Sequence, residues 1–275
     1  MKKILFFSAM AVALVFASCG SKAKKADASA EATVDSFQVA QMTEGLKVKV
    51  DSLAKEIARL GTMPIFSQAA GGQLTLTDKE KKMPPTYLMS LDQAAKAETS
   101  AKKANLLIIY NIEMQIAKAY DMPVEEYKAT LGKLMADLNC KEAIASFGDK
   151  IGKGREAETE AVNELYAKMS ETTEGVKTFW RMMSVVLIEN LYVLTQNIDK
   201  FMPLFTDETA SEVSYRLILV TEAMKSLVEV YPDMADLQAP LKSLDVLNAI
   251  DRKQLREQAL TLKGDIARQR QTLAE

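Results

Sequence analysis

Histidine is absent from this sequence of 275 residues, and only two cysteines are present. Without imidazole, catalysis by Ser-His-Asp or Cys-His groups, most haem ligation and histidine-based zinc sites are excluded. A bound metal would have to be a hard cation held by carboxylates, and we expect neither a metal nor another cofactor. The fifteen methionines are scattered along the chain, which is typical of core filling rather than of copper ligation.

The alternation of apolar and polar residues that marks a β-strand is also missing. Apolar residues instead recur at spacings of three and four, which places them on one side of an amphipathic helix. No fixed-period repeat indicates a solenoid. The sequence therefore predicts an all-α, irregular multi-helix bundle. Its helices are expected at residues 39–60, 90–120, 123–138, 141–147, 155–170, 173–201, 207–230 and 251–275.

Neither sign of charge is in large excess, because 35 Lys and Arg stand against 37 Asp and Glu. Such a balance lacks the basic footprint of a protein that binds nucleic acid or an anionic membrane surface. The hydrophobic content of 48% is enough for a sizeable core. We therefore expect one domain over residues 39–275, with no nucleic-acid partner.

The first eighteen residues have the pattern of a signal peptide. Lys2 and Lys3 precede an apolar stretch at residues 4–16, and the small residues Ala17 and Ser18 follow it. A membrane-spanning helix would need about 20 apolar residues, so this stretch is too short to be one. We interpret residues 1–18 as a targeting signal that is removed.

The residues "FASC" at 16–19 resemble the lipobox of bacterial lipoproteins, with Phe16 in place of the usual Leu. In that family the cysteine is diacylated on sulfur and becomes the mature N-terminus. The resemblance implies that Cys19 is the lipidation site, and two or three acyl chains would hold a domain on a bilayer almost permanently. An ordinary secreted protein cut near Cys19 is the alternative.

Residues 20–38 are rich in Ala, Ser, Lys and Glu and poor in apolar residues. Such a composition cannot bury a core, so residues 19–38 are predicted to be the lipidated cysteine and a flexible tether. No dense acidic run of the kind used for surface export follows Cys19. The expected location is therefore the bacterial cell envelope, facing the periplasm, with the membrane contacted through the lipid anchor only.

A segment with three prolines and three glycines lies at residues 61–87 and is not expected to form regular helix. Irregular segments of this length in compact domains are usually functional or disordered. The part from Met63 to Tyr87 is therefore a candidate binding surface.

The apolar segment at residues 179–198 contains one acid near its centre, Glu189. Charged residues make a membrane span costly, so a core helix is expected, in which this carboxylate is either paired or raised in pKa. With Asn190 and Tyr192 beside it, Glu189 could form the polar floor of a pocket. The alternative is a hydrogen bond between Glu189 and a neighbouring helix, or exposure of Glu189 on a narrow polar stripe.

Two other features carry open alternatives. If Cys19 is lipidated, Cys140 has no partner for an intramolecular disulfide, so it is predicted to be a buried small residue or to pair between chains. An apolar seam in the last helix could dock on its own bundle or bind a partner helix. The seam consists of Leu255, Ala259, Leu262, Ile266 and Leu273.

Four stretches in order, "MPPTYL", "YNIEMQIAKAYD", "VEEYKATLGKLMADLN" and "VVLIENLYVLTQ", resemble a group of all-helical envelope lipoproteins from Bacteroides-like bacteria. The resemblance covers residues 83–240. Val186, Leu187 and Ile188 stand at a Gly-Trp-Ile of that group, whereas Glu189, Leu191 and Tyr192 match. The group has no assigned activity, so the resemblance implies a fold and a location only.

These features predict an anchored envelope lipoprotein that acts as a binding or assembly module, with another envelope protein as a candidate partner. The alternative is a carboxylate-dependent hydrolase of cell-wall glycan in which Glu189 is the general acid. The two hypotheses differ in the surroundings of Glu189: a cleft favours the hydrolase and a closed core favours the binding protein.

Overall fold

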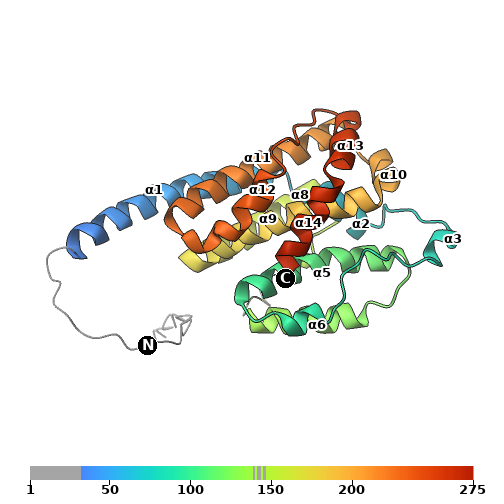
Figure 1. Ribbon diagram of the computed structural model, residues 1–275, viewed down its shortest axis with the longest axis horizontal. Helices are drawn as coiled ribbons and strands as arrows, with labels where there is room; N and C mark the ends of the chain where they lie inside the picture. Colours follow the sequence, from blue (N-terminus) through green and yellow to red (C-terminus); the bar gives the residue numbers. More distant parts are fainter. Residues whose placement is uncertain (1–31, 139, 141–143, 145–146, 275) are drawn as a thin grey trace, which may run out of the picture. The chain divides into compact units, whose positions relative to one another are not determined.

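The computed structural model describes residues 32–138, 140, 144 and 147–274 (Figure 1). The described residues form thirteen α-helices and two 3-10 helices and contain no strand, which confirms the all-α fold. The predicted signal peptide, Cys19, most of the tether and most of the helix expected at 141–147 lie outside the described residues. None of the described helices is long and apolar enough to cross a membrane.

The first half of the chain contains α1 (Ala32–Arg59), α2 (Pro64–Ala70), α3 (Asp78–Lys81), α4 (Gln93–Lys96), α5 (Ser100–Ala119) and α6 (Glu125–Asp137). The second half contains α8 (Arg155–Met169), α9 (Thr173–Gln196), α10 (Ile198–Phe201), a 3-10 helix (Met202–Leu204), α11 (Asp207–Val230), a 3-10 helix (Pro232–Leu237), α12 (Gln238–Lys242), α13 (Arg252–Thr261) and α14 (Lys263–Ala274). Within the described part of the chain, the residues from 41 onward belong to one compact unit.

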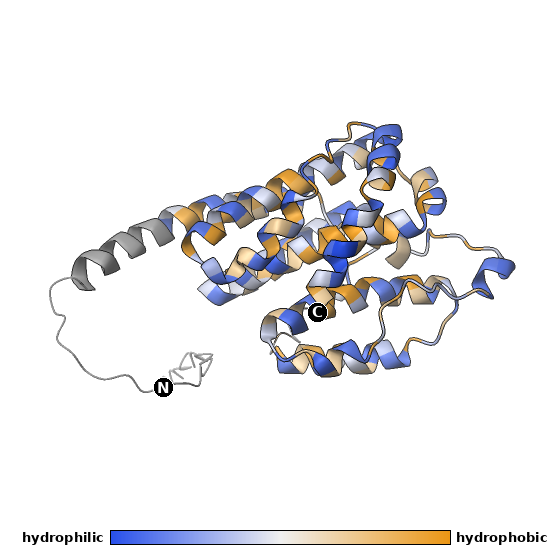
Figure 2. Cartoon of the chain, viewed as in Figure 1, coloured by the Kyte–Doolittle hydropathy of each residue, from blue (hydrophilic) through white to orange (hydrophobic). Residues whose placement is uncertain are grey.

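The central helix of the compact unit is α9, which packs against α2, α5, α8, α11, α13 and α14. Its side chains are buried over most of its length, and Phe179 and Trp180 have no exposed surface. Figure 2 shows many hydrophobic residues along α5 and α9, whereas α13 and α14 are mostly hydrophilic. A helix that is apolar nearly all round must be surrounded by others, and this explains why α9 lies at the centre.

Where local signals were strong, the helix bounds agree with the prediction. The helix α8 ends at Met169 against a predicted end at 170, and α11 spans 207–230 as predicted. Thr206 caps α11 through a hydrogen bond from the backbone N–H of Thr209. The apolar seam at the end of the chain is buried, so α13 and α14 dock on their own bundle.

Two predictions for the first part of the domain were wrong: the start of its first helix and the absence of regular helix at 61–87. The helix α1 begins at Ala32 rather than at residue 39, so the last part of the predicted tether is helical; no glycine or proline lies at 32–38 to stop a helix from extending. The segment at 61–87 contains two short helices, because Pro64 occupies the first turn of α2 and Thr77 caps α3 in a capping box with Glu80.

Three long predicted helices are interrupted. The helix expected at 90–120 is divided at Ala97, which has an extended backbone, and α5 begins after a Thr99 cap rather than at Ser90. The helix expected at 173–201 breaks at Asn197, whose side chain donates to the Tyr87 hydroxyl at 2.5 Å. The last helix is divided at Leu262. Side-chain hydrogen bonds that compete with the helix explain the breaks at Thr99 and Asn197.

Candidate functional site

Glu189 lies in a closed polar cluster at the centre of the bundle. The side chain has no exposed surface, and its Oε2 accepts a hydrogen bond of 3.0 Å from Nε of Arg270 on α14. The Nη2 of Arg270 also donates to Oε1 of Glu113 on α5, which accepts a second bond of 2.8 Å from the backbone N–H of Met89. We call Glu113, Glu189 and Arg270 the Arg270 cluster. One guanidinium therefore joins three helices.

The Arg270 cluster contains two carboxyl groups and one guanidinium. Burial and the charge of Glu189 raise the pKa of Glu113 well above its usual range. Burial also raises the pKa of Glu189, although Arg270 opposes this shift. Glu113 Oε2 and Glu189 Oε1 are buried and have no hydrogen-bond partner in the described part of the chain. This arrangement favours a proton on Glu113, which leaves Glu189 and Arg270 as a neutral pair.

The other two predicted pocket residues have separate environments. The Tyr192 ring lies 4.4 Å from the Arg270 guanidinium, and its hydroxyl donates to the Tyr87 carbonyl at 3.3 Å. Asn190 donates to the carbonyl of Val186 on its own helix at 2.7 Å. The structure therefore brings Glu189 and Tyr192 together around Arg270 and leaves Asn190 apart. None of the three lines the apolar cavity described below.

Sequence reasoning did not identify Glu113 or Arg270. Glu113 lies in "LLIIYNIEMQI", an acid within a strongly apolar stretch, which is the same signal that identified Glu189. Arg270 lies in the polar stretch "ARQRQT" and has no such signal. Only the packing of α14 against α5 and α9 shows its role.

A second buried carboxylate, Glu158 on α8, holds the chain that leads into α2. Its Oε2 accepts from the backbone N–H of Thr62 at 3.2 Å and from the Thr62 hydroxyl at 2.8 Å. Its Oε1 accepts from the Ser67 hydroxyl at 2.5 Å and from the Gly152 N–H at 3.0 Å. Gly152 has a φ of +75°, and a Cβ there would lie 2.6 Å from the nitrogen of Gly71. The two loops are thus fixed in close contact.

Arg216 on α11 lies beside this carboxylate and is only 4% exposed. Its Nη2 donates to the carbonyl oxygens of Leu60 and, at 2.9 Å, of Thr62. Glu212, one turn earlier, accepts two hydrogen bonds of 2.6 and 3.0 Å from Arg155. We call Arg155, Glu158, Glu212 and Arg216 the Arg216 cluster. Burial lowers the pKa of Arg216 to about 10.

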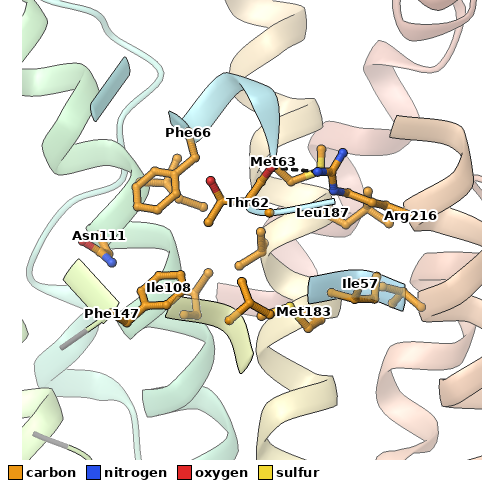
Figure 3. Close-up of a pocket in the computed structure, with 15 residues that line it drawn as sticks. Ile57, Thr62, Met63, Phe66, Ile108, Asn111, Phe147, Met183, Leu187 and Arg216 are labelled. Atoms are coloured by element: carbon orange, nitrogen blue, oxygen red, sulfur yellow. Dashed lines mark hydrogen bonds between the residues drawn. The ribbon is translucent and has the colours of Figure 1, made fainter. Parts of the chain in front are cut away.

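An apolar cavity of about 50 Å³ lies next to Arg216 (Figure 3). Its walls come from α1, α2, α5, α8, α9 and α11, together with Phe147. Asn111, Phe147 and Val186 are partly exposed, whereas the other lining residues are buried. The apolar side chains that line it include Ile57, Met63, Phe66, Ile108, Met183, Leu187 and Val220.

The candidate binding surface from Met63 to Tyr87 is divided between interior and exterior. Met63 and Phe66 are buried and line the cavity, whereas Met83 is 56% exposed. Tyr87 contacts Tyr192 edge to face at 6.2 Å between ring centroids. Only the first part of the segment therefore contributes to a described cavity.

Cys140 and the carboxylates provide no metal site in the described part of the chain, which holds no group of three or more potential ligands. The Cys140 thiol is half-buried and donates to the Met135 carbonyl at 3.8 Å. Burial raises its pKa to about 11, so the thiol is unreactive at neutral pH. Pairing of Cys140 between chains stays a prediction.

The fold and site together define an all-helical domain with a closed carboxylate–arginine cluster and a small apolar cavity. No protein family, curated protein or solved structure matches the chain. The resemblance to envelope lipoproteins therefore stays a prediction.

Proposed function

We propose that this protein is a lipid-anchored component of the bacterial cell envelope and that its helical domain acts by binding rather than by catalysis. The observation that carries the choice is the complete burial of Glu189 together with its ion pair to Arg270. A general acid must come within hydrogen-bond distance of the substrate atom that it protonates. A glycan outside the domain has no such access to Glu189.

The presence of two carboxyl groups, Glu113 and Glu189, is the observation that favours the hydrolase alternative. Glycosidases use such a pair on either side of the scissile bond. Here the guanidinium of Arg270 lies between the two groups and bonds to both. The guanidinium therefore occupies the place between the two acids that a sugar would need, and the arrangement supports a structural role for these acids.

Anchoring is tested by phase separation of the full chain in a detergent that clouds on warming. We expect the parent in the detergent phase and Cys19→Ala in the aqueous phase, because acyl chains on Cys19 supply the membrane affinity. Cys140→Ala is the matched control and should stay in the detergent phase. Unchanged partitioning of Cys19→Ala would contradict the proposed anchor.

Catalysis is tested separately with cell-wall glycan fragments. We expect the parent protein to release no product. Cleavage by the parent that disappears in Glu189→Gln would replace the binding proposal with the hydrolase. Envelope proteins that copurify with the anchored parent, and not with Cys19→Ala, would identify the partner of an assembly module.

A further inference from the structure

The guanidinium of Arg216 has fewer acceptors than its N–H groups require. Its Nη2 donates to two backbone carbonyls, whereas Nε and Nη1 are buried and have no hydrogen-bond partner among the described residues. The nearest carboxylate oxygen, Oε2 of Glu212, lies 3.6 Å from Nη1 and already accepts from Arg155. A guanidinium carries five N–H donors, and each buried donor that lacks an acceptor costs stability. Arg216 therefore has capacity for an additional anionic group.

The neighbouring carboxylate Glu158 does not fill this need. It accepts hydrogen bonds from Thr62, Ser67 and Gly152 and makes none to Arg216. The lowered pKa of Arg216, about 10, has burial as its first cause, and it agrees with a positive charge that the surrounding acids compensate incompletely.

The space beside Arg216 suits an aliphatic group. Arg216 lines the cavity of about 50 Å³, and Figure 3 shows its side chain reaching toward Thr62 and Met63. A dry engineered cavity of about 150 Å³ holds the six carbons of benzene, so by the same ratio this cavity holds roughly two carbons of a ligand chain. Met63 and Met183 in the wall are flexible side chains that adapt to a ligand.

The cavity reaches the partly exposed residues Asn111, Phe147 and Val186, which define the side from which a ligand would enter. A water molecule is a poorer occupant, because a buried water needs two to four polar partners. Next to the guanidinium, the walls of this cavity are apolar side chains such as Leu187 and Val220, which offer a water molecule no hydrogen bond. An aliphatic chain would pack against these walls, and an anionic group at its end would accept hydrogen bonds from Arg216.

We propose that the cavity binds a monocarboxylate with a short aliphatic chain, whose carboxylate accepts hydrogen bonds from Arg216 and whose chain lies between Ile108 and Leu187. This inference rests on the proposed binding function and specifies its ligand class. The chain runs toward the side bounded by Asn111 and Val186, so acids longer than the cavity extend outward there.

The test uses the purified full chain and hexanoic acid that carries a photoreactive diazirine on its chain. Labelled residues are located by mass spectrometry. We expect label on the cavity wall, at Met63 or Met183, and competition by unlabelled hexanoate. Hexanol should compete at least about tenfold more weakly, because it lacks the charge that pairs with the guanidinium. Acetate should not compete, because it has no chain to bury.

Arg216→Met should remove the preference for hexanoate over hexanol. Arg181→Met is the matched control, since Arg181 is another buried arginine, pairs with Asp236 and does not line the cavity; it should keep the preference. Val186→Trp places a large side chain at the partly exposed side and should reduce labelling of the wall at least about tenfold. This variant decides the question if Arg216→Met does not fold.

Three outcomes would overturn the inference: no specific label on the wall, equal competition by hexanoate and hexanol, or unchanged labelling in Val186→Trp. The first two would mean that the cavity holds water or an arbitrary apolar group. If hexanoate does not label the cavity wall, while anchoring depends on Cys19 and no glycan is cleaved, only this inference is wrong. Loss of anchoring would instead remove the proposed function without affecting the labelling.

Discussion

Arg270 on α14 and Arg216 on α11 are almost equally buried, at 6% and 4% exposure, yet their surroundings differ. Arg270 meets two carboxyl groups, which raise its pKa although burial opposes the charge. Arg216 meets two backbone carbonyls and one carboxylate that Arg155 shares, and its pKa is lowered to about 10. The Arg270 cluster therefore has an excess of negative groups, and the Arg216 cluster has an excess of donors.

This difference indicates separate roles for two clusters that look alike in composition. An excess carboxyl group can take up a proton and remain in a closed core. An excess of guanidinium donors cannot be removed by deprotonation, because arginine keeps its charge. The Arg270 cluster can thus be neutral without a further partner, whereas an additional acceptor beside the apolar cavity would stabilise the Arg216 cluster.

The largest effect is expected for Arg270→Met. It leaves Glu113 and Glu189 buried without a cation, and breaking a buried pair from one side costs about 3 to 5 kcal/mol. The free energy of unfolding in denaturant measures this loss. Arg256→Met, which removes an exposed pair with Asp199, is the control and should change stability little. Equal effects of the two variants would show that the Arg270 cluster does not hold the bundle together.

Arg216→Met should cost less, about 1 to 3 kcal/mol, because Glu212 keeps its bonds to Arg155 and only carbonyl acceptors are left without a donor. The same measurement of the free energy of unfolding compares the loss in Arg216→Met with the loss in Arg270→Met. A loss equal to that of Arg270→Met would remove the contrast between the two clusters.

Substitutions at Glu189 separate shape from hydrogen bonding. Glu189→Gln keeps an acceptor for Arg270 Nε and should melt close to the parent. Glu189→Leu leaves that donor unsatisfied and should lose about 1 to 3 kcal/mol. Thermal unfolding followed by circular dichroism distinguishes them, and similar melting of both variants would argue against a structural role for this carboxylate.

The smallest and most specific effect concerns pH. The pKa of Glu113 is raised in the folded state above its ordinary value of 4.5, so the folded state binds more protons than the unfolded chain above that pH. Its contribution to stability is fully present below pH 4.5 and is lost as pH rises through the folded pKa. Unfolding free energies measured across that interval should therefore decline more steeply with pH in the parent than in Glu113→Gln.

At neutral pH Glu113→Gln should be as stable as the parent or more stable, because it removes a buried carboxyl group without removing Oε1 as an acceptor. Glu80→Gln is a useful contrast: hydrogen bonds lower the pKa of the partly exposed Glu80 to about 2, so the contribution of Glu80 to stability changes with pH in the opposite direction. Identical slopes in the parent and Glu113→Gln would show that Glu113 does not carry the excess proton.

Several features of the fold were predictable from the sequence because they depend on residues within one or two helical turns. The spans of α8 and α11, the Thr206 cap and the absence of strands in the described residues follow from periodicity and capping. The apolar surroundings of Glu189 in the chain likewise predicted a carboxylate that is paired or raised in pKa, and Glu189 is paired with Arg270.

The partners of the buried charges were decided by tertiary structure alone. Arg270 reaches Glu189 across 81 residues and Glu113 across 157, and nothing in the polar stretch around Arg270 indicates such a contact. Arg216 meets a cavity because α1, α2, α5 and α9 bring their apolar sides together around it. Helical periodicity determines which residues share a face, but the packing of faces from distant helices determines which charge meets a partner and which lacks one.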